Sequence, residues 1–120
     1  MPPDELDPNL PQLAQISRAI SQVYKVKLGR GPERVHCHYA GPDAITCFLE
    51  GTLTPIERLL STIEEHQRLR DTRLLVQDAV RPELCRVIEG VIGRRVTTCT
   101  SGFDSRADVA SENFQLAAPA

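Results

Sequence analysis

Two runs of alternating residues, joined by a short turn, constrain the fold of this chain more than any other feature. The first run is ERVHCHY at residues 33–39, with apolar side chains on every second position: Val35, Cys37 and Tyr39. The second is AITCFLEG at residues 44–51, where the same spacing recurs: Ile45, Cys47 and Leu49. A period of two is typical of a strand with one buried face. The intervening AGPD favours a turn, so the sequence predicts an antiparallel hairpin.

The register of this hairpin decides where its histidines and cysteines point. One coherent apolar face requires Cys37 to lie opposite Cys47, because a slip of one residue would turn every apolar side chain to the other face. In that register His36 and His38 share the opposite face of the hairpin.

An amphipathic helix is predicted before the hairpin. Residues 12–27 carry apolar side chains spaced three and four apart, which makes one stripe of a helix. Gly29 and Gly31 provide a stop, and Pro32 prevents continuation.

A second helical region follows the hairpin. Thr54, Pro55 and Glu57 form the signature of a capping box, with proline in the first helical position. The apolar pattern then runs to Gly93. Because proline removes a helical hydrogen bond, we expect a kink or a fresh helix at Pro82.

Two further segments complete the predicted fold. Residues 94–104 alternate like a strand, and VASENFQL at residues 109–116 is a poorer strand whose polar residues suggest an edge or a partner-facing position. The order α-β-β-α-(α)-β-β predicts a two-layer α+β fold, with an antiparallel four-stranded sheet and helices packed on one face. We expect a single domain over residues 12–116, between a flexible lead-in (1–11) and a frayed tail (117–120).

Composition narrows the classes of function. The 120 residues, 41% hydrophobic and 25% charged, suit one globular domain. A net charge of −2 provides no field for nucleic acid, and no apolar run approaches the ~20 residues of a membrane helix. The acidic, proline-rich start is unlike a signal peptide. We therefore expect a cytoplasmic protein without nucleic-acid binding or membrane insertion, whose cysteines are thiols.

The histidines and cysteines of the hairpin are candidate site residues. His36 and His38, about 7 Å apart on one strand face, suit two ligands of a zinc ion. The alternative is an exposed or helix-packed face on which histidine is merely tolerated. Cys37 and Cys47 are candidates for a redox pair, although the sequence favours buried thiols that act as small hydrophobes.

A glycine-rich corner is the third candidate. In Gly29-Arg30-Gly31-Pro32, two glycines allow backbone amides to approach an anion and Arg30 supplies charge. The alternative is a helix end followed by a proline turn, where the helix dipole disfavours anions. We take Arg30 and Gly31, together with Glu50 and Gly51 after the second strand, as candidate ligand-binding residues.

Three motifs, taken in order, resemble the MpsC family, also called YbcI-like. They are LGRGPERV after the first helix, FLEGTLTPIE after the hairpin, and RPELCRVIEGVIGRRV before the last hairpin. The resemblance covers residues 13–116, and it implies a small cytoplasmic protein associated with a sodium-translocating, membrane-potential-generating system that is also linked to inorganic-carbon uptake. It supplies no catalytic residues.

The sequence leaves several functions open. We expect a non-catalytic accessory or regulatory protein, which forms a homodimer and binds a membrane-protein partner at its cytoplasmic face. The alternatives are a small-molecule or metal-binding sensor built on Arg30, His36 and His38, and a metal-dependent bicarbonate or CO2 enzyme. No P-loop or dinucleotide motif is present.

Overall fold

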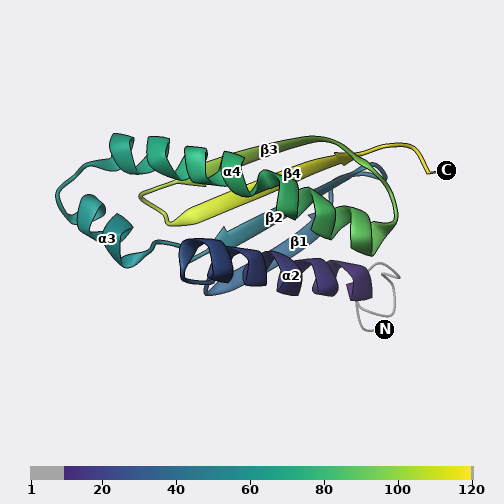
Figure 1. Ribbon diagram of the computed structural model, residues 1–120, viewed down its shortest axis with the longest axis horizontal. Coiled ribbons are helices and arrows are strands. Elements are labelled where there is room, and N and C mark those ends of the chain that lie inside the picture. Colours follow the sequence, from purple (N-terminus) through teal and green to yellow (C-terminus); the bar gives the residue numbers. More distant parts are fainter. Residues whose placement is uncertain (1–9, 120) are drawn as a thin grey trace.

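The computed structural model describes residues 10–119 of the chain. The seven elements follow one another as predicted (Figure 1): α2 (Leu10–Leu28), β1 (Arg34–Tyr39), β2 (Ala44–Glu50), α3 (Pro55–Thr62), α4 (His66–Ile92), β3 (Val96–Asp104) and β4 (Val109–Leu116). Most of the predicted lead-in lies outside the described residues, and its last two residues belong to α2. In the predicted tail, the amide of Ala117 donates to the carbonyl of Arg95 at 2.8 Å.

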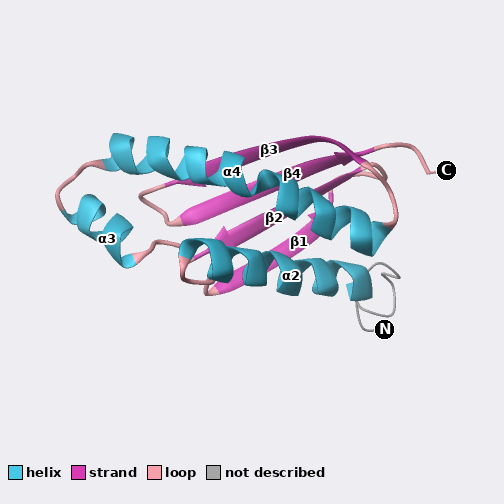
Figure 2. Cartoon of the chain, in the orientation of Figure 1, coloured by secondary structure: helices cyan, strands magenta, loops and turns pink. Residues whose placement is uncertain are grey.

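The four strands form one antiparallel sheet in the order β1-β2-β4-β3. The hairpin register is confirmed, since Cys37 pairs with Cys47 and Tyr39 with Ile45. Helices α2 and α4 lie over one face of the sheet (Figure 2). No helix of residues 10–119 covers the other face, which we call the open face. The predicted α+β class and layering are therefore confirmed.

Strand β4 does not occupy the edge position that its polar sequence suggested. It lies between β2 and β3, so β1 and β3 are the edges. Its helix-facing residues are all buried: Ala110, Glu112, Phe114 and Leu116. The edge prediction was wrong because Glu112 has partners in the core, which the strand's own sequence cannot reveal.

The core lies between the helices and the sheet. Helix α2 contributes a stripe at helical spacing: Leu13, Ile16, Ile20 and Tyr24. Helix α4 contributes a second stripe: Leu69, Val80, Leu84 and Ile88. Each fully buried aliphatic side chain of this kind stabilises the fold by roughly 1.5–3 kcal/mol.

Pro82 does not divide the second helical region. Helix α4 is 27 residues long and includes Pro82. Its ribbon bends partway along (Figure 1). Packing on both sides of the proline, by Val80 and Leu84, outweighs the ~3 kcal/mol that an interior proline costs. The helical region is interrupted earlier, between α3 and α4, where Glu64 adopts a left-handed conformation with φ of 63°.

Candidate functional site

The two strand histidines meet on the open face of the sheet. His36 Nδ1 lies 3.1 Å from His38 Nε2, and His36 Nε2 lies 3.3 Å from Glu50 Oε2. The ring of His36 stacks on that of Phe48, with centroids 5.5 Å apart. Within residues 10–119 no group of three or more histidine, cysteine or acidic side chains is placed to hold a metal ion. One chain therefore brings two imidazoles together, without a third ligand.

Cys37 and Cys47 lie on the opposite, helix-covered face, and both are buried. The Ser17 hydroxyl donates to Cys37 Sγ at 3.3 Å. The hydrogen bond between Cys47 and Cys37, together with burial, raises the pKa of the Cys47 thiol. This thiol therefore stays protonated at neutral pH. These contacts suit thiols that pack in the core, and a redox role for the pair stays a prediction.

The glycine-rich corner joins the end of α2 to the loop before α3. Arg30 donates to the carbonyl of Leu53 at 2.6 Å and to Glu33 at 3.1 Å. Gly51 has φ of 67°, and a Cβ there would lie 2.6 Å from the Glu33 side chain, so any other residue would be strained and would displace Glu33. Ligand binding at Arg30, Gly31, Glu50 and Gly51 stays a prediction, since the Arg30 guanidinium already binds the protein's own groups.

A buried arginine, which the sequence analysis missed, organises the start of α3. Arg73 of α4 has no exposed surface. Its Nε donates to Glu57 Oε2 at 2.9 Å and its Nη2 to Glu57 Oε1 at 2.5 Å. It also donates to the hydroxyl and carbonyl oxygens of Thr52, at 2.8 and 2.9 Å, and lies 4.4 Å from the centre of the Phe103 ring. Four of its five donor hydrogens are thereby satisfied.

Glu57 also completes the predicted capping box. Its carboxylate accepts from the amide of Thr54 at 2.9 Å, while the Thr54 hydroxyl accepts from the amide of Glu57. Burial alone would raise the pKa of Glu57, but the hydrogen bonds from Arg73 and Thr54 outweigh it and lower the pKa. One side of α3 is thus fixed to the body of the protein by an ionised carboxylate.

This anchoring turns the apolar side of α3 toward solvent. None of the eight residues of α3, all of them described, is buried. Ile56, Leu59 and the adjoining Ile63 are 73%, 67% and 66% exposed, and their spacing of three and four places them on one side of the helix. We call these three residues the α3 stripe. In an ordinary surface helix the apolar side faces the core. In α3 only Leu60 packs against the core, and the α3 stripe faces outward, the reverse of the usual orientation.

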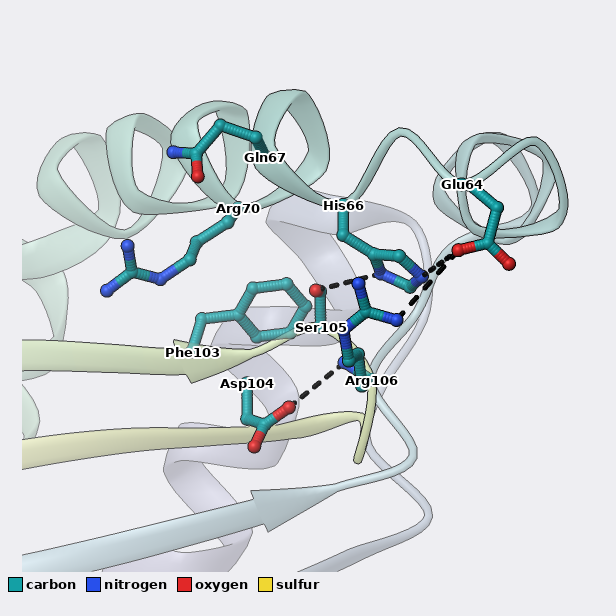
Figure 3. Close-up of a pocket in the computed structure, with 8 residues that line it drawn as sticks. All are labelled: Glu64, His66, Gln67, Arg70, Phe103, Asp104, Ser105 and Arg106. Carbon is teal, nitrogen blue, oxygen red and sulfur yellow. Dashed lines mark hydrogen bonds and ion pairs between the residues drawn. The ribbon is translucent and has the colours of Figure 1, made fainter.

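A polar cavity of about 530 Å³ lies where the α3–α4 junction approaches the turn between β3 and β4 (Figure 3). His66 Nδ1 lies 3.0 Å from Ser105 Oγ, and Arg106 lies 3.9 Å from Glu64. The Asp104 carboxylate accepts hydrogen bonds from the backbone amides of residues 106 and 107, and these hydrogen bonds lower the pKa of Asp104. Nothing in the sequence signalled that Ser105 approaches His66, because the two residues lie 39 positions apart.

The order Ser105, His66, Glu64 is similar to the relay of a serine hydrolase, but its geometry does not support that chemistry. Glu64 Oε2 is 3.9 Å from His66 Nε2, beyond hydrogen-bonding distance. Ser105 is 7% exposed, so a substrate carbonyl could not reach its oxygen without rearrangement. The His66–Ser105 contact instead ties the start of α4 to the β3–β4 turn.

Together these features define the class of protein: a small two-layer α+β domain that fixes a short helix with its apolar side outward. Residues 12–118 match the family model of the Na+-translocating membrane potential-generating system (MpsC), and the chain belongs to that family. The resemblance noted in the sequence is confirmed. Searches of curated proteins and of solved structures found no match. No helix within residues 10–119 combines the length and hydrophobicity needed to cross a bilayer.

Proposed function

We propose that the protein is a non-catalytic accessory component of the sodium-translocating membrane system after which its family is named. In this proposal it regulates that system by docking the α3 stripe into an apolar groove on the cytoplasmic face of a membrane-protein partner. The observation that carries the proposal is the reversed orientation of α3.

The fixation of α3 supports a role in binding. A short helix with three large apolar side chains in water would lower the free energy of the folded state by rotating these side chains toward the core. The Glu57–Arg73 pair and the capping box prevent that rotation. A buried charge pair therefore keeps the α3 stripe exposed, although this exposure does not favour folding. A partner that covers the stripe explains the exposure.

The size of the stripe favours a groove over a flat interface. Stable interfaces bury about 1,200–2,000 Å² in total, more than two short helices lying side by side provide. A groove surrounds the helix, and anchors at positions i, i+3 and i+7 are the pattern of helix-in-groove recognition. Ile56, Leu59 and Ile63 have this spacing.

Site-specific photo-crosslinking in cells tests this proposal. A photoreactive residue at Leu59 should crosslink to an integral membrane component of the sodium-translocating system, identified by mass spectrometry. The matched control carries the same residue at Leu75 of α4, which is 69% exposed but lies outside the stripe. The Ile56→Asp/Ile63→Asp variant should abolish the crosslink from position 59.

Stability and lipid binding are measured alongside. Because the stripe is exposed, the double variant should unfold within about 1 kcal/mol of the wild type, so a lost crosslink reports binding. Equal crosslinking from positions 59 and 75 would contradict the proposal. So would stripe-dependent binding of the purified protein to protein-free anionic vesicles, which would indicate a lipid surface instead of a protein groove.

A further inference from the structure

The distance between the facing nitrogens of the two strand histidines matches that between two nitrogen ligands of one metal ion. Their facing nitrogens, His36 Nδ1 and His38 Nε2, are 3.1 Å apart. Two imidazole nitrogens that bind one tetrahedral zinc ion at its usual bond length are about 3.3 Å apart. Only a small adjustment of the rings would place zinc between them.

Glu50 completes the arrangement as a positioning residue. It lies 3.3 Å from Nε2 of His36, the nitrogen that does not face His38. A carboxylate there holds the proton on Nε2 and leaves Nδ1 as a bare ligand, which is the usual outer-shell partner of a metal-bound histidine. Stacking on Phe48 fixes the plane of the same ring.

The described residues of one chain supply only these two ligands, since no third histidine, cysteine or carboxylate converges with them. A structural zinc site needs four. Another molecule can supply the missing ligands, and the place of the histidines on an edge strand indicates which one.

Strand β1 is an edge of the sheet, and no other strand of residues 10–119 pairs with its outer side. Ala40 donates to the carbonyl of Ala44 on the side of β2. Because backbone direction alternates along a strand, the even-numbered residues of β1 face β2. Val35, Cys37 and Tyr39 therefore direct their amides and carbonyls outward, away from the sheet.

A second copy can pair with this edge in a register that brings the histidines together. If Cys37 lies opposite Cys37 of the second copy, the outward-facing backbone groups form about six hydrogen bonds across a two-fold axis. His36 of each copy then lies opposite His38 of the other in the closely spaced, non-hydrogen-bonded position. All four imidazoles then share the face of the sheet opposite to α2 and α4.

We propose that two copies of this chain join through their β1 edges around one zinc ion, held by His36 and His38 of each copy. The site goes beyond the docking role of α3, because it involves neither that helix nor its partner. It makes dimerisation dependent on zinc, and the ion exchanges between the dimer and solution as free zinc rises and falls.

Titration of the purified, chelator-treated full chain with zinc chloride tests the proposal. Light scattering after size exclusion should show the mass change from 13.3 kDa to twice that value. Elemental analysis of the dimer should give one zinc for two chains. His36→Ala and His38→Ala should each remove both effects, and Glu50→Gln should weaken zinc affinity about 10–100-fold. Magnesium, which prefers oxygen ligands, should have no effect.

The third histidine provides the matched control. His66 lies in the cavity of Figure 3, so His66→Ala should dimerise with zinc as the wild type does. One zinc per monomeric chain would overturn the proposal, as would a dimer that survives chelation or that His36→Ala leaves intact. The side chains of His36 and His38 lie on the open face, so the variants at these two positions should keep the wild-type circular dichroism spectrum and melting temperature. A variant that fails to fold is replaced by His36→Gln/His38→Gln.

Discussion

Glu112 lies in the middle of β4, and its side chain points into the helix-covered face of the sheet with no exposed surface. Its carboxyl oxygens accept hydrogen bonds from Tyr24 at 2.9 Å, Gln77 at 3.1 Å and Ser101 at 2.6 Å. Burial raises the pKa of Glu112, and these hydrogen bonds offset only part of the increase. A polar cluster thus lies inside an otherwise aliphatic core.

The raised pKa has a consequence for stability. The folded state keeps its proton on Glu112 at pH values where the unfolded chain has lost it, so the free energy of unfolding falls as pH rises above about 4.5. The free energy of unfolding stops falling once the pH exceeds the pKa of Glu112 in the folded state. The total loss is about 1.4 kcal/mol for each unit by which folding raises that pKa.

Glu112→Gln should remove this fall and leave the variant at least as stable as the wild type at pH 7. The glutamine carbonyl still accepts from Tyr24 and Gln77, and its amide can donate to Ser101. Urea unfolding between pH 4.5 and 8 is the measurement, and Glu83→Gln in the surface pair with Lys27 is the control. Parallel stability curves for Glu112→Gln and the wild type would contradict the prediction.

At the scale of elements, α3 depends on one buried pair for its position. Truncating one member of such a pair leaves the other charge without a partner and costs about 3–5 kcal/mol. Glutamine in place of Glu57 can still cap the helix, because the capping box accepts either residue. The two contributions of Glu57, to the cap and to the ion pair, can therefore be separated.

Arg73→Met should lower the free energy of unfolding by about 3–5 kcal/mol, and adding Glu57→Gln should restore part of it. A double-mutant cycle by urea denaturation measures the coupling. Arg68→Met is the control on the same helix, because Arg68 is exposed and 3.5 Å from Glu65. It should change stability by less than about 1 kcal/mol. Equal losses for Arg73→Met and Arg68→Met would show that the buried pair does not hold α3.

The elements differ in how far sequence could predict them. The hairpin register and the capping box follow from residues close together in the chain, and both are confirmed. The central position of β4 and the burial of Arg73 could not be predicted in this way, because they depend on partners distant in sequence. Glu112 meets Tyr24 across 88 positions, and Arg73 meets Thr52 across 21. Leu59 and Ile63 belong to the apolar pattern predicted from the sequence. Their outward orientation was not predicted, because it depends on the contact of Glu57 with Arg73 as well as on the capping box.

At the scale of the whole molecule, stability should be uneven. The core residues lie on α2, α4 and the sheet, except for Leu53 in the loop before α3, whereas the fully described α3 buries none. Regions with few buried contacts open locally at a lower free-energy cost than the core. We expect amides in α3 to exchange with deuterium at least tenfold faster, relative to their intrinsic rates, than those of β4.

Hydrogen exchange followed by mass spectrometry measures this difference. Peptides covering residues 55–62 are compared with peptides covering residues 109–116. A bound partner should slow exchange in the first set and leave the second unchanged. Equal protection of α3 and β4 in the free protein would show that α3 belongs to the same cooperative unit as the core.

The central place of β4 also affects how the chain is made. It follows every other described element in sequence, yet it joins β2 to β3. While residues 109–116 are still inside the ribosome, the emerged strands have no template between them, and their inward-facing apolar side chains stay partly uncovered. The sheet thus stays in two parts until β4 has emerged, and a nascent-chain chaperone can bind the uncovered strands in that interval.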